Sequence, residues 1–127
     1  MINQILLCAG AALPLFWGAA HLFATKLVVK GFGDISLDNR RIITMEWIVE
    51  GVALVFIGAI VLAATLIDRA SDVSKAVYLL SFVMLNVLSV VSLKTGFKVS
   101  FAPFKLCPVI FTVASILILL GIYSAPD

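Results

Sequence analysis

Charged side chains are scarce in this sequence. Of its 127 residues, 13% are Asp, Glu, Lys or Arg, whereas 63% are hydrophobic. A typical soluble domain is about 25% charged and roughly 45–50% apolar. A compact soluble fold of this length buries too little surface to hide so many apolar side chains. The scarcity of charge therefore excludes an ordinary soluble domain and favours one domain, residues 1–127, that lies within a lipid bilayer.

The residues that build common catalytic and metal sites are equally rare. The chain has one histidine, His21, and two cysteines, Cys8 and Cys107. It contains no phosphate-binding glycine loop, no HExxH motif and no CxxC motif. A haem that bridges two helices needs a second axial ligand, which a single histidine does not supply. The net charge is +2 and no run of basic residues occurs. We therefore expect no metal site and no nucleic-acid partner.

Four long apolar runs dominate what is present. They cover residues 2–24, 42–67, 73–93 and 106–123, and each is close to the roughly 20 residues that a helix needs to cross a bilayer. Lipid cannot satisfy unpaired backbone groups, so a spanning segment is a helix or a barrel strand. These runs lack the polar–apolar alternation of barrel strands. The sequence therefore predicts an all-α integral membrane four-helix bundle with up-down-up-down topology.

Positive charges are distributed unequally between the connections. The first and third connections carry Lys26, Lys30, Arg40, Arg41, Lys94, Lys98 and Lys105, and the second carries Arg69 and Lys75. Membrane proteins keep an excess of Lys and Arg on the cytoplasmic side. We therefore expect a multi-pass protein of the cell membrane, in the first place the bacterial inner membrane, with both termini on the outer side.

The connections carry further local signals. In the third, Phe97, Phe101 and Phe104 alternate with lysines. This pattern is typical of a segment that lies on the inner head groups, although an ordinary interfacial loop has the same composition. In the first, Asp38 or Asn39 is a suitable residue to cap the second helix.

Polar side chains occur at a similar depth in all four runs, in the half nearest the cytoplasm. The predicted ligand-binding wall is Trp17, His21, Glu46, Trp47, Glu50, Asn86, Ser89, Thr112 and Ser115. Residues four apart share a helix face. Glu46 and Glu50 are therefore expected on one face of the second helix, and Trp17 and His21 on one face of the first. An ionisable side chain deep in a span costs about 2.5–3.5 kcal/mol on insertion scales, and this cost falls if the side chain faces the bundle interior. The pattern predicts a polar pocket in the inner leaflet.

Each of these residues also has a simpler interpretation. Glu46 and, less readily, Glu50 can extend to water, and Glu46 can pair with Arg40 or Arg41. A single histidine near a helix end is often structural, and Ser or Thr in a span usually bonds back to its own helix. Asn86 can join two helices without contacting a ligand.

Small residues form a stripe along the second run. Gly51, Gly58 and Thr65 follow one another at steps of seven residues, and small residues allow helix backbones to approach closely in membranes. The stripe fits either a neighbouring helix of the same bundle or a second subunit. A homodimer or larger oligomer through Gly51 and Gly58 is therefore one expected partnership.

Two segments resemble a known family. The segment WIVEGVALVFIG, residues 47–58, resembles the second helix of DoxX-like membrane proteins. The segment GAAHL, residues 18–22, is similar to their first helix, where a lysine often stands in place of His21. The resemblance covers about half of the chain and implies the four-span fold of that family. The family is functionally mixed, and because some members are associated with quinone-linked sulfur oxidation, the resemblance also implies a quinone as one cofactor to consider.

Three functions fit these features. The first is binding of membrane lipid, a quinone or another small amphipathic molecule, with Glu50 and His21 at its head and Trp17 and Trp47 as walls. The second is an intramembrane enzyme, an isomerase or a redox subunit, in which Glu50 or Glu46 is the base and His21 the acid. The third is a small proton-coupled transporter that acts as an oligomer, with Glu50 as the proton site. All three need His21 and Glu50 to lie close together inside the membrane.

Overall fold

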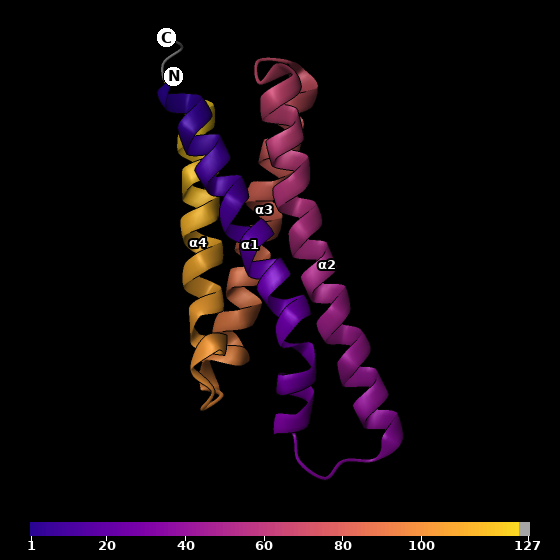
Figure 1. Cartoon of the computed structure of the whole chain (residues 1–127). Helices are drawn as coiled ribbons and strands as arrows, with labels where there is room; N and C mark the ends of the chain where they lie inside the picture. Colours follow the sequence, from indigo (N-terminus) through magenta and orange to yellow (C-terminus); the bar gives the residue numbers. More distant parts are fainter. Residues whose placement is uncertain (125–127) are drawn as a thin grey trace.

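Helices account for nearly all of the chain that the computed structural model describes, residues 1–124. Helix α1 covers Ile2–Gly31, α2 Leu37–Asp68, α3 Asp72–Lys94 and α4 Ala102–Tyr123, with a short 3₁₀ helix, η1, at Gly96–Lys98 (Figure 1). Within this range no strand occurs, and all four α-helices are long and apolar enough to cross a membrane. The predicted all-helical fold with four candidate membrane-spanning helices is confirmed.

The helices extend beyond the apolar runs from which they were predicted. α1 continues past its expected end at residue 24 to Gly31, so Lys26 and Lys30 lie on the helix. α4 begins at Ala102 instead of residue 106. Lysine is a good helix former, and the charged flanks therefore continue a helix after its hydropathy has fallen.

The start of α2 differs in a similar way. The helix begins at Leu37 instead of residue 42, and its N-cap is Ser36. The Ser36 hydroxyl oxygen accepts a hydrogen bond from the Asn39 backbone N–H over 3.2 Å. The prediction that Asp38 or Asn39 caps this helix is wrong, because both residues already belong to its first turn.

The four helices form a ring in which each packs against two others. Within the described residues, α1 and α3 both contact α2 and α4, but α1 does not approach α3 and α2 does not approach α4. The start of α1 and the end of α4 lie together, and the Asn3 side-chain amide donates a hydrogen bond to the Ser124 carbonyl over 2.8 Å (Figure 1). We call this the terminal end. The α1–α2 and α3–α4 connections lie at the opposite end, called the basic end because it holds seven of the nine lysines and arginines (Figure 1).

Glycines let α1 and α2 pack with their backbones in near contact. An added Cβ at Gly18 would lie 2.6 Å from the Gly51 carbonyl oxygen, and one at Gly58 would lie 2.5 Å from the Ala11 carbonyl oxygen. Both distances are too short for a carbon atom, so only glycine fits at these two positions. The stripe of Gly51 and Gly58 is therefore used within the chain, and a homodimer would have to form through another face.

Large apolar side chains cover much of the outer surface. Phe23 and Phe56, for example, are 91% and 63% exposed, whereas Leu54, Leu85 and Phe111 are fully buried between the helices. An outer surface of this kind is an aggregation hazard in water. In a membrane, acyl chains would cover this apolar surface and remove the aggregation hazard. The exposed apolar side chains therefore agree with four candidate membrane spans.

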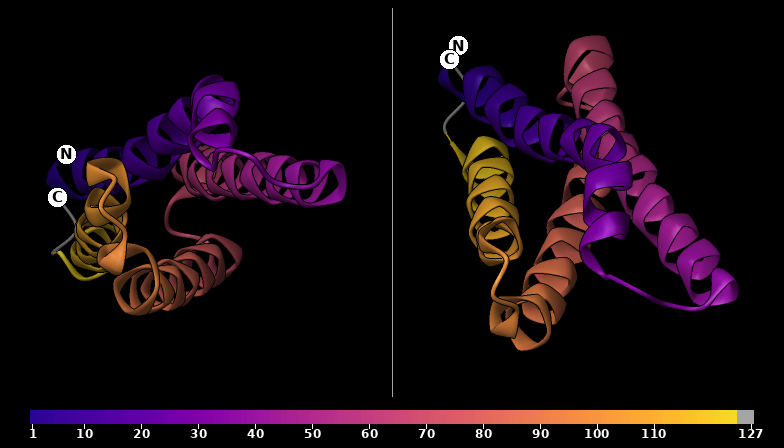
Figure 2. Two further views of the ribbon diagram at one scale, coloured as in Figure 1. Left: turned by 90° about the horizontal axis from the view of Figure 1, so that it is seen from below. Right: turned by 60° about the horizontal axis from the view of Figure 1, so that its bottom comes forward.

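α1 changes direction along its length and connects the two sides of the bundle (Figure 2). Near its start Leu7 packs against Gly121 of α4, and farther along Gly18 packs against α2. Pro14 lies between these contacts and has no N–H to donate to the preceding turn, which favours a bend. Towards the basic end α1 therefore lies against α2, and a groove opens between α1 and the start of α4.

Candidate functional site

His21 is buried at the α1–α2 interface in the half of the bundle nearest the basic end. Its surface is 4% exposed, and its ring stacks on Trp47 of α2 with centroids 4.4 Å apart and planes 20° apart. Trp17, one turn earlier on α1, meets the imidazole edge-on with centroids 5.7 Å apart. Trp47 Nε1 also donates a hydrogen bond to the His21 carbonyl oxygen over 2.7 Å. These contacts hold the imidazole in place between two indoles.

Glu50 approaches the same imidazole from α2. Its Oε1 lies 3.7 Å from His21 Nε2, and its side chain is 39% exposed. The other ring nitrogen, Nδ1, lies 3.0 Å from the Trp17 carbonyl oxygen. Because a carbonyl oxygen only accepts, Nδ1 is the donor and carries a proton. Nε2 is therefore the ring nitrogen that faces the Glu50 carboxylate.

This geometry predicts the tautomer of neutral His21. With the proton on Nε2 alone, the Nδ1 lone pair would face the Trp17 carbonyl oxygen. Only the Nδ1–H form makes the hydrogen bond to the Trp17 carbonyl. If that bond contributes a net free energy of about 1.4 kcal/mol, the Nδ1–H form is favoured over the Nε2–H form roughly tenfold. Since His21 is the only histidine, nitrogen-15 NMR of the imidazole reports on it without further assignment. In a Glu50→Gln variant, whose side chain stays neutral, we expect Nδ1–H; a dominant Nε2–H form would contradict the geometry.

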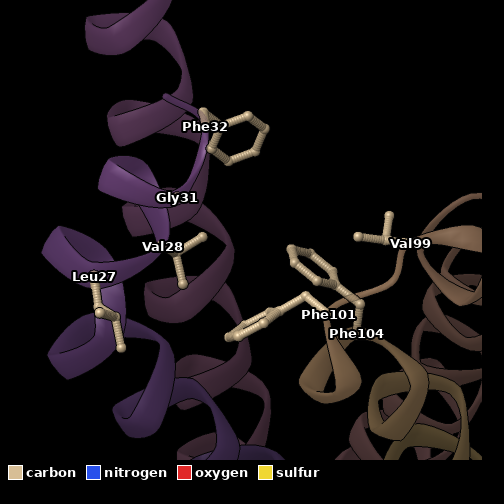
Figure 3. A pocket seen from close by; sticks show the side chains of 7 residues that line it. All are labelled: Leu27, Val28, Gly31, Phe32, Val99, Phe101 and Phe104. Carbon is tan, nitrogen blue, oxygen red and sulfur yellow. The ribbon is translucent and has the colours of Figure 1, made fainter. Parts of the chain in front are cut away.

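A groove runs from His21 towards the basic end, between α1 and the start of α4. It consists of a deeper cavity of about 280 Å³ that reaches Trp17, His21 and Trp47, and an outer cavity of about 360 Å³. The residues that line both cavities are Leu27, Val28, Phe101 and Phe104. Figure 3 shows two phenyl rings on the α4 side that face the aliphatic side chains of α1 across the outer cavity. The groove is therefore apolar along its length and reaches the imidazole cluster at its inner limit.

One polar atom beside the groove is buried without a partner. Trp17 lines the deeper cavity, and its Nε1 has no hydrogen-bond acceptor among residues 1–124. The thiol of Cys107, on the α4 side of the same cavity, is a weak sulfur partner for this N–H and also contacts the Pro103 carbonyl over 3.7 Å. A buried N–H without an acceptor costs roughly 1–3 kcal/mol. The N–H does not open onto the cavity, so an acceptor oxygen of a bound molecule would remove this penalty only after the indole turns.

Other predicted wall residues do not join this cluster. Glu46 is exposed on α2, one turn nearer the basic end than Glu50. The Asn86 amide donates to the carbonyl of Phe82, and the Ser115 hydroxyl donates to that of Thr112, so each bonds to its own helix. These hydrogen bonds satisfy the polar groups without a ligand.

Ser89 and Thr112 form a contact of their own between α3 and α4. The Ser89 hydroxyl donates to the Pro108 carbonyl over 3.0 Å and lies 2.8 Å from the Thr112 hydroxyl. Thr112 is otherwise exposed. The structure therefore gathers Trp17, Trp47 and Glu50 around the imidazole ring of His21. The predicted polar residues do not form a single layer across all four helices.

The α4 wall of the groove was missed by reasoning from the sequence. Phe101, Phe104 and Cys107 all line it, and Phe104 meets Trp47 edge-on with ring centroids 5.5 Å apart. The alternation of Phe and Lys is visible in the sequence, but it fits a segment on the head groups or an ordinary interfacial loop and does not indicate a groove. In the structure Phe101 and Phe104 face α1, and they extend the indole–imidazole stack towards the basic end.

Comparisons with protein-family models, with curated proteins and with solved structures find no match for this chain. Among residues 1–124, no three His, Cys, Asp or Glu side chains lie close enough together to hold a metal ion. The function is therefore argued from the groove and from the His21–Glu50 pair.

Proposed function

We propose that this chain is a multi-pass membrane protein that binds a small amphipathic molecule, a lipid or a quinone, in the groove between α1 and α4. The observation that carries the proposal is the deeper cavity of about 280 Å³, whose walls include both indoles and His21. Ligand sites in proteins are typically apolar clefts with a few placed polar groups. The groove supplies the apolar cleft, and the polar atoms of Trp17 and His21 lie behind its surface.

The polar groups define the head of the ligand. Trp17 Nε1 is a buried donor in the cavity wall with only the Cys107 thiol beside it. An indole that turned towards the cavity would bind an acceptor oxygen on the head, such as a quinone or ester carbonyl. The stacked rings of Trp47 and His21 favour a flat head group. The apolar outer cavity, with Phe101 and Phe104 on one side, suits a hydrocarbon tail.

The membrane orientation follows from the charges. The basic end holds seven of the nine lysines and arginines, and under the positive-inside rule it faces the cytoplasm. In this proposal the four helices cross the membrane up-down-up-down, both termini are outside and the groove lies in the inner leaflet. A bacterial inner membrane and a place among DoxX-like proteins, which rests on the residues around His21 and Glu50, remain part of the proposal.

A second function is favoured by the His21–Glu50 pair. At 3.7 Å, Nε2 and the carboxylate can exchange a proton after a small side-chain movement, as an acid and a base must. His21 lines the deeper cavity, whereas Glu50 approaches the imidazole from outside that lining. An intramembrane enzyme or redox subunit would use Glu50 as base and His21 as acid on a molecule held in the groove, so it needs the same binding site.

Intrinsic fluorescence tests the binding proposal directly. The chain has only two tryptophans, and both Trp17 and Trp47 line the deeper cavity. In nanodiscs, a short-chain benzoquinone or a phospholipid with brominated acyl chains should quench them saturably, because each probe would be held in contact with the indoles. Saturation with the quinone assigns the quinone class, and saturation with the brominated lipid assigns the lipid class. Quenching that rises linearly for both probes would overturn the proposal.

A further inference from the structure

A second pocket lies at the terminal end, far along the bundle from the groove. Its volume is about 270 Å³, and all four helices or their connections contribute to it. Its polar lining is Asn3, Arg69, Lys75, Tyr78 and Ser124. The apolar part of the lining includes Leu7 and Ile122. A pocket at the ends of spanning helices lies at the depth of the lipid head groups.

Asn3 supplies an unused acceptor. The residue is 9% exposed, and its Nδ2 donates to the Ser124 carbonyl over 2.8 Å. That carbonyl accepts only, which fixes the orientation of the amide and leaves Oδ1 as the free atom. Oδ1 is buried without a partner among residues 1–124. A hydrogen-bond donor from a bound molecule is what this atom lacks.

The charged side chains in the described lining of the same pocket are both basic. Arg69, at the end of α2, makes no ion pair among the described residues, and Lys75 is paired only at the exposed surface, where its Nζ lies 3.1 Å from Asp72 Oδ1. No Asp or Glu belongs to the described lining. A guanidinium beside an ammonium is a suitable pair for a phosphate group.

We propose that the terminal pocket binds a phosphodiester head group that carries a primary ammonium as its hydrogen-bond donor. The phosphate lies between Arg69 and Lys75, and the donor reaches Asn3 Oδ1. Leu7 and Ile122 contact the first part of the attached chain. The same head-group chemistry occurs in membrane phospholipids and in soluble phosphate esters. The terminal pocket lies at the opposite end of the bundle from the groove. The proposal of a head-group site there does not depend on the function proposed for the groove.

A pair of lipids that differ only in the donor tests the proposal. Delipidated protein is titrated with dioleoyl phosphatidylethanolamine or dioleoyl phosphatidylcholine, and bound lipid is counted by native mass spectrometry. The two lipids share the phosphate, but only the ethanolamine lipid has N–H groups. Because a hydrogen bond from a charged donor is worth at least about a factor of ten in affinity, the ethanolamine lipid should bind at least about tenfold more tightly.

Two variants separate the parts of the site. Arg69→Gln should lower the affinity for both lipids about tenfold, whereas Arg40→Gln, a matched exposed arginine at the basic end, should change neither. Asn3→Leu should bring the ethanolamine lipid down to the level of the choline lipid. Displacement of the bound lipid by glycerophosphoethanolamine would identify soluble esters as ligands, and failure to displace it would identify the membrane lipid. Equal affinity for the two lipids, or equal effects of Arg69→Gln and Arg40→Gln, would overturn the proposal.

Discussion

Replacement of Gly18 by alanine should lower the free energy of unfolding by about 2 kcal/mol, the middle of the range for overpacked buried sites. The new Cβ would lie 2.6 Å from the Gly51 carbonyl oxygen and 2.7 Å from the Val55 nitrogen. Both atoms belong to the α2 backbone, which cannot turn aside as a side chain can. Relief therefore requires α1 and α2 to separate by about 1 Å, the shortfall from normal van der Waals distance.

The glycines of the chain form a graded series for this experiment. Gly58→Ala should resemble Gly18→Ala, because its Cβ also meets backbone atoms of α1. Gly51→Ala should cost less, since the nearest atom is Leu22 Cδ2 at 2.9 Å, at the end of a flexible side chain. Gly31 has no atom within 4 Å of its added Cβ, and alanine favours a helix over glycine by roughly 0.5–1 kcal/mol. Gly31→Ala is therefore the control that should be neutral or slightly stabilising.

Unfolding of the purified variants in detergent, followed by circular dichroism, measures these differences. Separation of α1 from α2 should also weaken the hydrogen bond from Trp47 to the His21 carbonyl, and a red-shifted tryptophan emission would report it. If Gly18→Ala and Gly31→Ala were equally stable, the close α1–α2 contact would be wrong.

The four helices could be predicted because spanning is a local property. A run of apolar residues of the right length is sufficient, and residues 42–67 and 73–93 fall inside α2 and α3. The ends could not be predicted in the same way. Lys26 and Lys30 lower the hydropathy but favour a helix, and Ser36 is recognised as a cap only when its hydrogen bond to Asn39 is seen.

Depth in the membrane could also be derived from the sequence. Two consecutive helices that reverse at a connection place residues equally far from it side by side. His21 and Glu50 were assigned to one depth in this way, and the structure has them 3.7 Å apart. Side-chain direction is harder to derive. Residues four apart differ by about 40° around a helix, and α1 and α2 cross, so the face that meets His21 at Glu50 has turned away at Glu46.

The groove needed information that no local pattern contains. Its two walls, Leu27 and Val28 on one side and Phe101 and Phe104 on the other, are far apart in the sequence. Whether a phenylalanine beside lysines enters the head groups or packs on another helix depends on how far α1 bends away from α4. That bend results from Pro14 together with the glycine contacts to α2. Composition alone therefore could not show that Phe101 and Phe104 line a groove.

Ala24→Phe should abolish saturable binding in the groove, with a loss of affinity of at least about tenfold, because a ligand that cannot enter forfeits the burial of several methylene groups at about 0.8 kcal/mol each. Ala24 lines the deeper cavity, and a phenyl ring there would fill much of the space beside His21. The substitution changes neither the His21–Glu50 pair nor the indoles. Loss of quenching by the benzoquinone or the brominated lipid would therefore reflect blocked access.

Ala59→Phe is the matched control for this variant. Ala59 is exposed on α2 and does not line the groove, so a phenyl ring there faces lipid and should leave quenching unchanged. Phe104→Ala gives the opposite perturbation. It removes a ring shared by both cavities, and the widened groove should accept a bulkier quinone while it binds the small benzoquinone less tightly. If Ala24→Phe retained saturable quenching equal to that of Ala59→Phe, the indoles would be quenched from the open bilayer and the groove would hold no ligand.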